Sequence, residues 1–225
     1  MNILAVDSAT KACSVAIWRG DRIGARRFVP TARGHAEMLV PMVSGVMKDA
    51  GLRFSDLDRL AVTIGPGHFT GLRAGLAAIR GVALASGLPV IGMTTLMAVA
   101  HGVALEKRLG RRIVVALESK RAEIYVQMFD ERLMPLSAPL ALTPMAAAAD
   151  LHGPVLLVGD GGVRLMAALA DGQAEFADAG AWPDAAVVAR VAAALPEPAA
   201  GDLPAPIYLH PAEAQIPASD GGRRP

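Results

Sequence analysis

The sequence predicts an α/β protein of two duplicated lobes, each with a mixed sheet flanked by helices. Three observations support this class: short aliphatic strands alternate with helical patterns, the strand order of the first half recurs in the second, and a Gly-x-Gly turn follows one buried strand in each half. We expect an N-terminal lobe over residues 1–110, a C-terminal lobe of related topology over 111–217 and a disordered tail at 218–225.

The first half predicts three strands and then helix, strand, helix, strand and helix. Gly20 and Asp21 are typical of a hairpin turn between the second and third strands. Gly51 ends the first helix, because glycine adopts the left-handed cap without steric cost. The expected elements are strands at 2–7, 13–19 and 22–29, a helix at 35–50, a strand at 60–64, a helix at 71–86, a strand at 90–93 and a helix at 95–107.

The second half repeats this order. Ile3–Ser8 aligns with Val114–Ser119 at an offset of 111 residues, and the same offset places Ser14–Trp18 on Tyr125–Phe129. The expected elements are strands at 113–118, 123–129 and 133–137, an alanine-rich helix at 144–150, a strand at 155–158 and a helix that ends near residue 169.

Composition excludes several classes of protein. The 225 residues include 22 basic and 21 acidic side chains, a net charge of +1, and 53% are hydrophobic. This balance predicts a packed core and argues against a chain that grips nucleic acid through its own phosphate contacts. The single cysteine, Cys13, excludes an intramolecular disulfide and a cysteine-rich metal site, so we expect a reduced, cytoplasmic protein.

Residues 81–105 carry no charge and are long enough to span a membrane. Gly87 and Pro89 interrupt this stretch, and His101 lies within it. We therefore expect a helix end, a buried strand and a new helix, with no membrane association. Residues 1–7 lack the pattern of a signal peptide.

Two strand ends offer candidate sites for a nucleotide or phosphate. A carboxylate followed by hydroxyls can hold a hydrated metal ion or a phosphate, although Asp7 can equally cap the turn through its own backbone. Residues 65–75 have neither the Walker lysine nor the dinucleotide fingerprint, which leaves an anion site at a helix N-terminus or a close backbone approach. The candidates are Asp7, Ser8, Thr10, Gly65, Gly67, Gly159 and Gly161.

The helices expected at 35–50 and 71–86 form a candidate partner surface. Each glycine inside a helix costs roughly 1 kcal/mol relative to alanine, and close helix approach offsets this cost. Flexible methionines suit adaptable contacts, although such a stripe also serves as ordinary core. The candidate interface residues are His35, Met38, Leu39, Met42, Val46, Gly71, Ala74, Gly75 and Ala78.

No catalytic or metal-binding residue is predicted. The five histidines are scattered, without the i, i+4 pair that places two ligands on one helix face. No Gly-x-Ser-x-Gly nucleophile elbow occurs. Glu118, Arg121 and Glu123 either line a cleft opposite Asp7 or form a solvated strand end.

Several segments resemble the TsaB (YeaZ) family of bacterial tRNA threonylcarbamoyladenosine biosynthesis proteins. The resemblance is carried by Ile3–Thr10 with Cys13–Ala16, and by Gly65–Gly75, which is similar to the family's Gly-Pro-Gly-Ser-Phe-Thr-Gly signature with His68 in place of serine. Residues 89–92, 94–96 and 206–209 also fit. Glu118 departs from the aspartate usual at that strand end.

The resemblance implies an actin-like, Hsp70-like ATPase fold and a scaffold role without catalysis by this chain alone. The implied partners are a TsaD-like catalytic subunit, a TsaE-like ATPase and, when alone, a second copy bound through the helix pair. It implies contact with tRNA only through the complex, and no cofactor of this chain's own, with ATP only within the complex. The alternatives are an active nucleotide-binding phosphotransferase or ATPase of the same superfamily, and the glycoprotease activity once attached to this branch.

Overall fold

The computed structural model describes residues 1–198 and 201–209, and the predicted tail at 218–225 lies outside them. The first sheet consists of β1 (Asn2–Asp7), β2 (Ala12–Arg19), β3 (Arg22–Pro30), β4 (Arg59–Thr63) and β5 (Val90–Met93). Their order is β3-β2-β1-β4-β5, in which β1 pairs antiparallel with β2 and parallel with β4. Tight connections produce the antiparallel pairs, whereas β4 and β5 are reached through helices and therefore run parallel.

The second sheet has the same topology. It consists of β6 (Arg112–Glu118), β7 (Ile124–Phe129), β8 (Leu140–Leu142), β9 (Val155–Val158) and β10 (Ala174–Phe176), in the order β10-β9-β6-β7-β8. Read from the other end, this order matches the first sheet strand for strand. The predicted duplication and the actin-like fold class are therefore confirmed.

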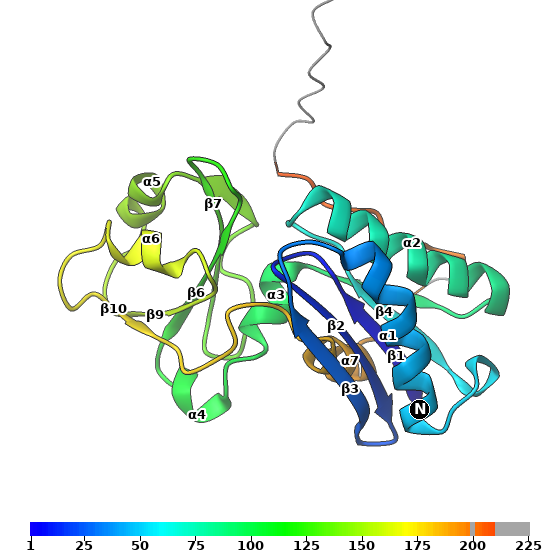
Figure 1. Cartoon of the computed structure of the whole chain (residues 1–225). Helices are drawn as coiled ribbons and strands as arrows, with labels where there is room; N and C mark the ends of the chain where they lie inside the picture. Colours follow the sequence, from blue (N-terminus) through cyan, green and yellow to red (C-terminus); the bar gives the residue numbers. More distant parts are fainter. Residues whose placement is uncertain (199–200, 210–225) are drawn as a thin grey trace, which may run out of the picture.

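Helices cover both faces of each sheet, and two of them cross between the lobes (Figure 1). α1 (His35–Ala50) and α2 (Phe69–Ser86) pack on one face of the first sheet, and α7 (Ala185–Ala194), from the second half of the chain, packs on the other. α3 (Thr95–Ala100), from the first half, packs on the second sheet. A cut at residue 110 would therefore separate both crossing helices from the sheets that they cover.

The remaining helices are short. They are η1 (Phe54–Asp56), α4 (Leu105–Arg108), α5 (Pro144–Ala149) and α6 (Gly162–Met166). α5 and α6 supply part of the core on the other face of the second sheet. None of the helices in the described residues is both long and apolar enough to cross a membrane. Cys13 is buried in β2.

Two predicted elements and the constant offset between the halves were wrong. Residues 133–137 form no strand, because Leu133 has a φ of +64° and the Asp130 carboxylate accepts hydrogen bonds from two backbone N–H groups of the same turn. The helix expected at 95–107 is split into α3 and α4 by a turn at Gly102. The constant offset fails by one residue, since Asp7 lies opposite Ser14 but Glu118 lies opposite Ile124.

The C-terminal end of α7 is held by a buried arginine of the first lobe. Arg59 donates from Nη1 to the carbonyl oxygens of Ala192 at 2.7 Å and Leu195 at 2.8 Å. Helix ends leave carbonyl groups without intrahelical partners, so this side chain satisfies two groups that water reaches poorly.

Arg59→Ala is expected to lower the free energy of unfolding by about 2 kcal/mol, because two carbonyl groups lose their partner. Urea unfolding measures the change. Arg111→Ala is the control, because it removes an exposed ion pair with Glu175 and is expected to cost less than about 1 kcal/mol. Equal losses in the two variants would contradict the capping role of Arg59.

Candidate functional site

The loop after β1 is buried beneath the start of α2. The Asp7 carboxylate is fully buried, and its Oδ1 accepts hydrogen bonds from the Thr63 hydroxyl at 2.6 Å and from the Ala9 N–H at 3.3 Å. Burial raises the pKa of this carboxyl from 3.8 to about 7. The Ser8 hydroxyl donates to the carbonyl oxygen of Gly71 at 2.8 Å, which ties the loop to α2.

Glycines permit this close approach. A Cβ on Gly67 would lie 2.2 Å from the carbonyl oxygen of Ala9, and one on Gly71 would lie 2.1 Å from that of Ser8. On Gly75 it would lie 2.6 Å from the Ser8 hydroxyl oxygen. Of the two interpretations of this segment, the structure therefore supports close backbone approach.

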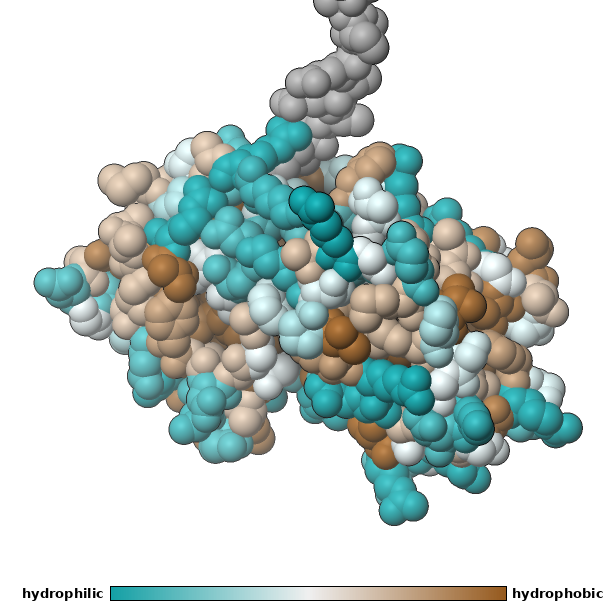
Figure 2. All heavy atoms as spheres, in the orientation of Figure 1, coloured by the Kyte–Doolittle hydropathy of each residue, from teal (hydrophilic) through white to brown (hydrophobic). Residues whose placement is uncertain are grey.

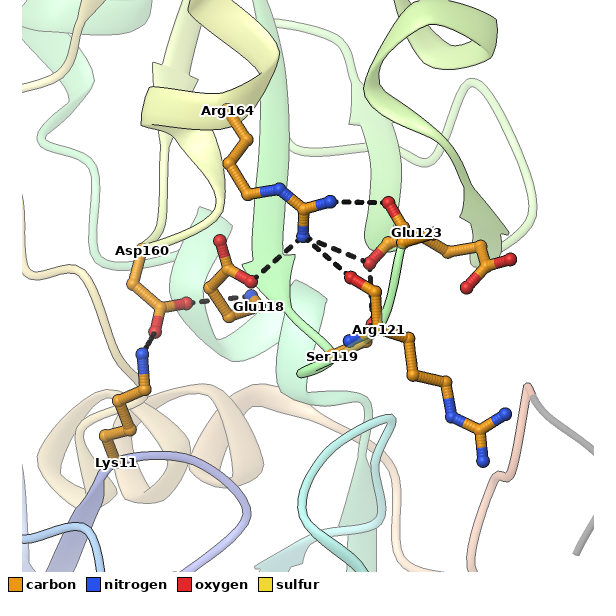
Figure 3. Close-up of polar contacts among 8 residues, drawn as sticks. Lys11, Glu118, Ser119, Arg121, Glu123, Asp160 and Arg164 are labelled. Carbon is orange, nitrogen blue, oxygen red and sulfur yellow. Dashed lines mark hydrogen bonds and ion pairs between the residues drawn. The ribbon is translucent and has the colours of Figure 1, made fainter. Parts of the chain in front are cut away.

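The equivalent turn of the second lobe is also closed. Gly161 donates its N–H to the carbonyl oxygen of Ala116, and a Cβ on Gly159 would lie 2.2 Å from that same oxygen. Asp160 between them accepts a hydrogen bond from the Glu118 N–H, and its carboxylate pairs with Lys11 of the first lobe at 3.3 Å. This ion pair joins the strand-end loops of the two lobes (Figure 3).

A cleft of about 770 Å³ lies between the lobes. Its walls are the N-terminal ends of α1 and α2, the turn between β6 and β7, and the C-terminal segment at 207–209. Of the seven predicted nucleotide-binding residues, Gly67 lines this cleft, whereas Asp7, Ser8, Thr10, Gly65, Gly159 and Gly161 do not. The predicted set therefore does not converge on one open site.

The three charged residues singled out on the second lobe have different roles. Glu118 forms an ion pair with Arg164 at 3.1 Å, and the backbone carbonyl of Glu123 accepts a hydrogen bond from the same guanidinium. The side chain of Arg121 points away from this cluster and lines the cleft (Figure 3). The strand end is therefore stabilised by Arg164, and only Arg121 of the three faces the cleft.

The predicted partner-interface list requires a correction, because most of its side chains are inside the protein. The buried members are His35, Leu39, Met42, Val46, Gly71 and Gly75, whereas Met38, Ala74 and Ala78 are half-buried. The stripe packs into the core against the first sheet, and the glycines pack against the loop after β1. His35 donates from Nε2 to the carbonyl oxygen of Thr10 at 2.9 Å. Of these six, His35 and Gly71 border the cleft between the lobes, whereas Leu39, Met42, Val46 and Gly75 face the interior.

Other residues form the exposed side of the helix pair. Val40 on α1 is 62% exposed, and Leu84 on α2 is 89% exposed. Hydrophobic surface is visible over α2 (Figure 2). Both residues lie off the apolar stripe that faces the sheet, and an aliphatic residue on the outer side of a helix was the signal that could have identified them.

Phe69, Arg73 and Tyr208 were also missed, and the tertiary structure brings them together at the cleft. The Phe69 and Tyr208 rings lie 5.6 Å apart, and the Arg73 guanidinium lies 3.7 Å above the Phe69 ring. Tyr208 reaches this place because the C-terminal segment runs beside β4, where Ile207 donates its N–H to the carbonyl oxygen of Ile64. Phe69 and Arg73 form an i, i+4 pair on α2, whereas the distance of Tyr208 along the sequence gave no local signal of its place beside them.

Within residues 1–198 and 201–209, no group of three or more His, Cys, Asp or Glu side chains is arranged to hold a metal ion.

Comparisons with known proteins give concordant matches. Residues 28–138 match the family model described as TsaD, tRNA N6-adenosine threonylcarbamoyltransferase. The tRNA threonylcarbamoyladenosine biosynthesis protein TsaB of Escherichia coli is 40% identical over 125 residues, which are 56% of this chain and 53% of that protein. Uncharacterized protein Rv3421c of Mycobacterium tuberculosis is 35% identical over 159 residues, 69% of this chain and 70% of that one.

The structure of YeaZ from Pseudomonas aeruginosa superposes with a TM-score of 0.80 at 26% identity, covering 92% of this chain and 99% of that chain. The sequence match to the curated TsaB proteins, by contrast, spans about half of their length.

Proposed function

The chain belongs to the TsaB (YeaZ) family, and on that premise we propose that it is a non-catalytic scaffold subunit in the biosynthesis of threonylcarbamoyladenosine in tRNA. It binds a TsaD-like threonylcarbamoyltransferase, with a TsaE-like ATPase as a further partner of the complex, and it pairs with a second copy when the catalytic subunit is absent. We place it in the cytoplasm, where the tRNA is.

The closed strand-end loops carry this proposal. In an ATPase of this fold class the two loops would flank a nucleotide phosphate, and their glycines would leave backbone N–H groups open to it. Here Gly67 and Gly71 press against the loop after β1, and Lys11 pairs directly with Asp160 across the lobes. This packing favours the proposal that the chain is a binding subunit over the alternative that it is an active phosphotransferase.

The exposed side of α1 and α2 supports the partner-binding part of the proposal. Val40 and Leu84 are exposed on α1 and α2, whose inner sides pack into the core against the first sheet. Large apolar side chains exposed on the outer sides of two packed helices are candidates for contacts with a partner. A substitution at Gly75 would be a poor test of this face, because a Cβ there would meet the Ser8 side chain and disturb the fold.

Val40→Arg and Leu84→Arg are therefore expected to weaken association with the cognate TsaD by at least about tenfold, because each places a charge in the desolvated centre of an interface. Co-purification and the mass of the complex measure the effect. The matched control is Val163→Arg, which alters a valine that is 69% exposed on α6. If all three variants bind as the wild type does, the helix pair is not the interface.

A second measurement separates scaffold from ATPase. We expect the isolated chain to bind ATP with a dissociation constant in the millimolar range or weaker, and we expect Asp7→Ala to leave this affinity unchanged. Micromolar ATP binding that is lost in Asp7→Ala would overturn the scaffold proposal in favour of the phosphotransferase.

A further inference from the structure

The cleft between the lobes gathers positive charge that the net charge of the chain conceals. Four cationic side chains line it: Arg33 before α1, Arg73 on α2, and Lys120 and Arg121 in the turn between β6 and β7. The acidic side chain in the lining is Glu37. Hydrophilic surface gathers along the upper junction of the two lobes (Figure 2). A near-neutral protein therefore presents a local basic surface, and local charge governs encounters with anions.

Arg33, Arg73 and Lys120 form no internal ion pair that would neutralise them within the described residues. Lys120 has a φ of +63°, a left-handed conformation that is uncommon for a residue other than glycine. The turn between β6 and β7 thus places Lys120 in the lining of the cleft, opposite α2.

Arg73 is held in position to bind an anion. Its guanidinium carbon Cζ lies 3.7 Å from the centroid of the Phe69 ring, and its Nε donates to the Tyr208 hydroxyl at 3.0 Å. These contacts use one face and one N–H of the group. The remaining N–H pair can donate in parallel to two oxygens of one phosphate, the geometry that favours arginine at phosphate sites.

The same wall offers aromatic surface. Phe69 is 50% exposed and Tyr208 is 42% exposed, and their rings are tilted by 36° to each other. His68 beside them stays neutral, because burial first and then the Lys120 charge lower its pKa to about 4. Exposed rings beside cations are typical of surfaces that stack unpaired bases while binding the backbone phosphates.

We propose that this cleft binds a single-stranded segment of the RNA substrate directly, with phosphates on Arg73, Lys120 and Arg33 and a base against Phe69 and Tyr208. The inference rests on the proposed function. It replaces the expectation that this chain contacts tRNA only through its partners. A volume of about 770 Å³ accommodates a nucleotide-sized group. An acidic peptide would use the cations but gain little from the rings, which is why RNA is the favoured occupant.

The first test is the affinity of the full chain for a fluorescently labelled tRNA transcript at several salt concentrations. Lys120→Gln is expected to weaken binding about fivefold at low salt and to reduce the slope of log K against log salt by about 1. Lys107→Gln, which removes an exposed lysine on α4, is the matched control and should leave both quantities unchanged. Equal weakening in both variants would mean non-specific attraction and would overturn the proposal.

The second test concerns stacking. Phe69→Leu is expected to weaken tRNA binding about tenfold, since one stacked base is worth ~1–3 kcal/mol. Phe54→Leu, at a ring that is 42% exposed on η1, is the control and should bind as the wild type does. If polyglutamate displaces the tRNA and Phe69→Leu binds both as well as the wild type, the cleft takes an acidic segment. If ATP at micromolar concentration displaces it, the cleft takes a free nucleotide.

The same variants are assayed for association with TsaD. If the variants associate with TsaD as the wild type does, and none of these substitutions alters the affinity for tRNA, the proposal of an RNA-binding cleft is refuted. The scaffold proposal then remains intact. Failure of the wild-type chain to associate at all would refute the scaffold proposal instead.

Discussion

Gly71→Ala is expected to lower the free energy of unfolding by about 3 kcal/mol, whereas Gly81→Ala in the same helix is expected to raise it by about 1 kcal/mol. A Cβ on Gly71 would lie 2.1 Å from the carbonyl oxygen of Ser8, a backbone atom that can move only if the loop after β1 moves. Gly81 has open space around its Cα, so alanine there gains helix propensity without a clash.

Urea unfolding of the two variants beside the wild type measures this contrast. Because both changes add one methyl group to α2, effects on the unfolded chain largely cancel between them. A destabilised Gly71→Ala with a stabilised Gly81→Ala confirms that α2 rests directly on the loop. Equal shifts of the same sign would show that helix propensity alone explains the glycines.

The wild type is expected to lose up to about 4 kcal/mol of unfolding free energy through Asp7 as the pH rises from about 4 to about 7, and Asp7→Asn is expected to abolish this loss. Burial raises the pKa of this carboxyl from 3.8 to about 7, so between these values the folded protein holds a proton that the unfolded chain has released. The contribution of Asp7 to stability is therefore complete below about pH 4, falls as the pH rises and is constant above about pH 7. Asparagine stays neutral throughout.

The measured quantity is the difference in unfolding free energy between Asp7→Asn and the wild type from pH 4 to pH 8, and it should shift in favour of the variant by pH 7. His68 and His101, whose pKa values burial lowers to about 4, add the opposite slope to both proteins and cancel in the difference. In the control, Asp56→Asn, the difference should stay flat from pH 5 to pH 8, because hydrogen bonds from Arg53 lower the pKa of that exposed carboxyl. A flat difference for Asp7→Asn as well would contradict a buried, protonated carboxyl.

The sequence predicted the fold well where the pattern is local. Aliphatic strands, the hairpin at Gly20 and the helix stop at Gly51 were all visible, and their order revealed the duplication. β10 and α7 were missed. α7 is rich in alanine and valine, and its buried face packs on the sheet of the other lobe. β10 has three residues and carries little periodicity.

The candidate sites were less predictable, because a stripe in the sequence does not say which side faces outward. Methionines and glycines pointed to α1 and α2 as a partner surface, but Met42 and Gly71 are buried. Val40 and Leu84 are the large apolar side chains exposed on the outer side of these helices. The cationic and aromatic cleft joins α2 to a turn of the second lobe and to the segment around Tyr208.

By itself, then, the sequence determined the class of the protein, a duplicated α/β chain with a large core and a net charge of +1. It also indicated that the glycine-rich helix packs closely against another segment. Only the tertiary structure decided what the helix approaches, which glycines need the space, and where the few cations collect. The physical reason is that strand and helix periodicity depends on neighbours in the sequence, whereas backbone contact and local charge depend on segments that meet only when the lobes pack together.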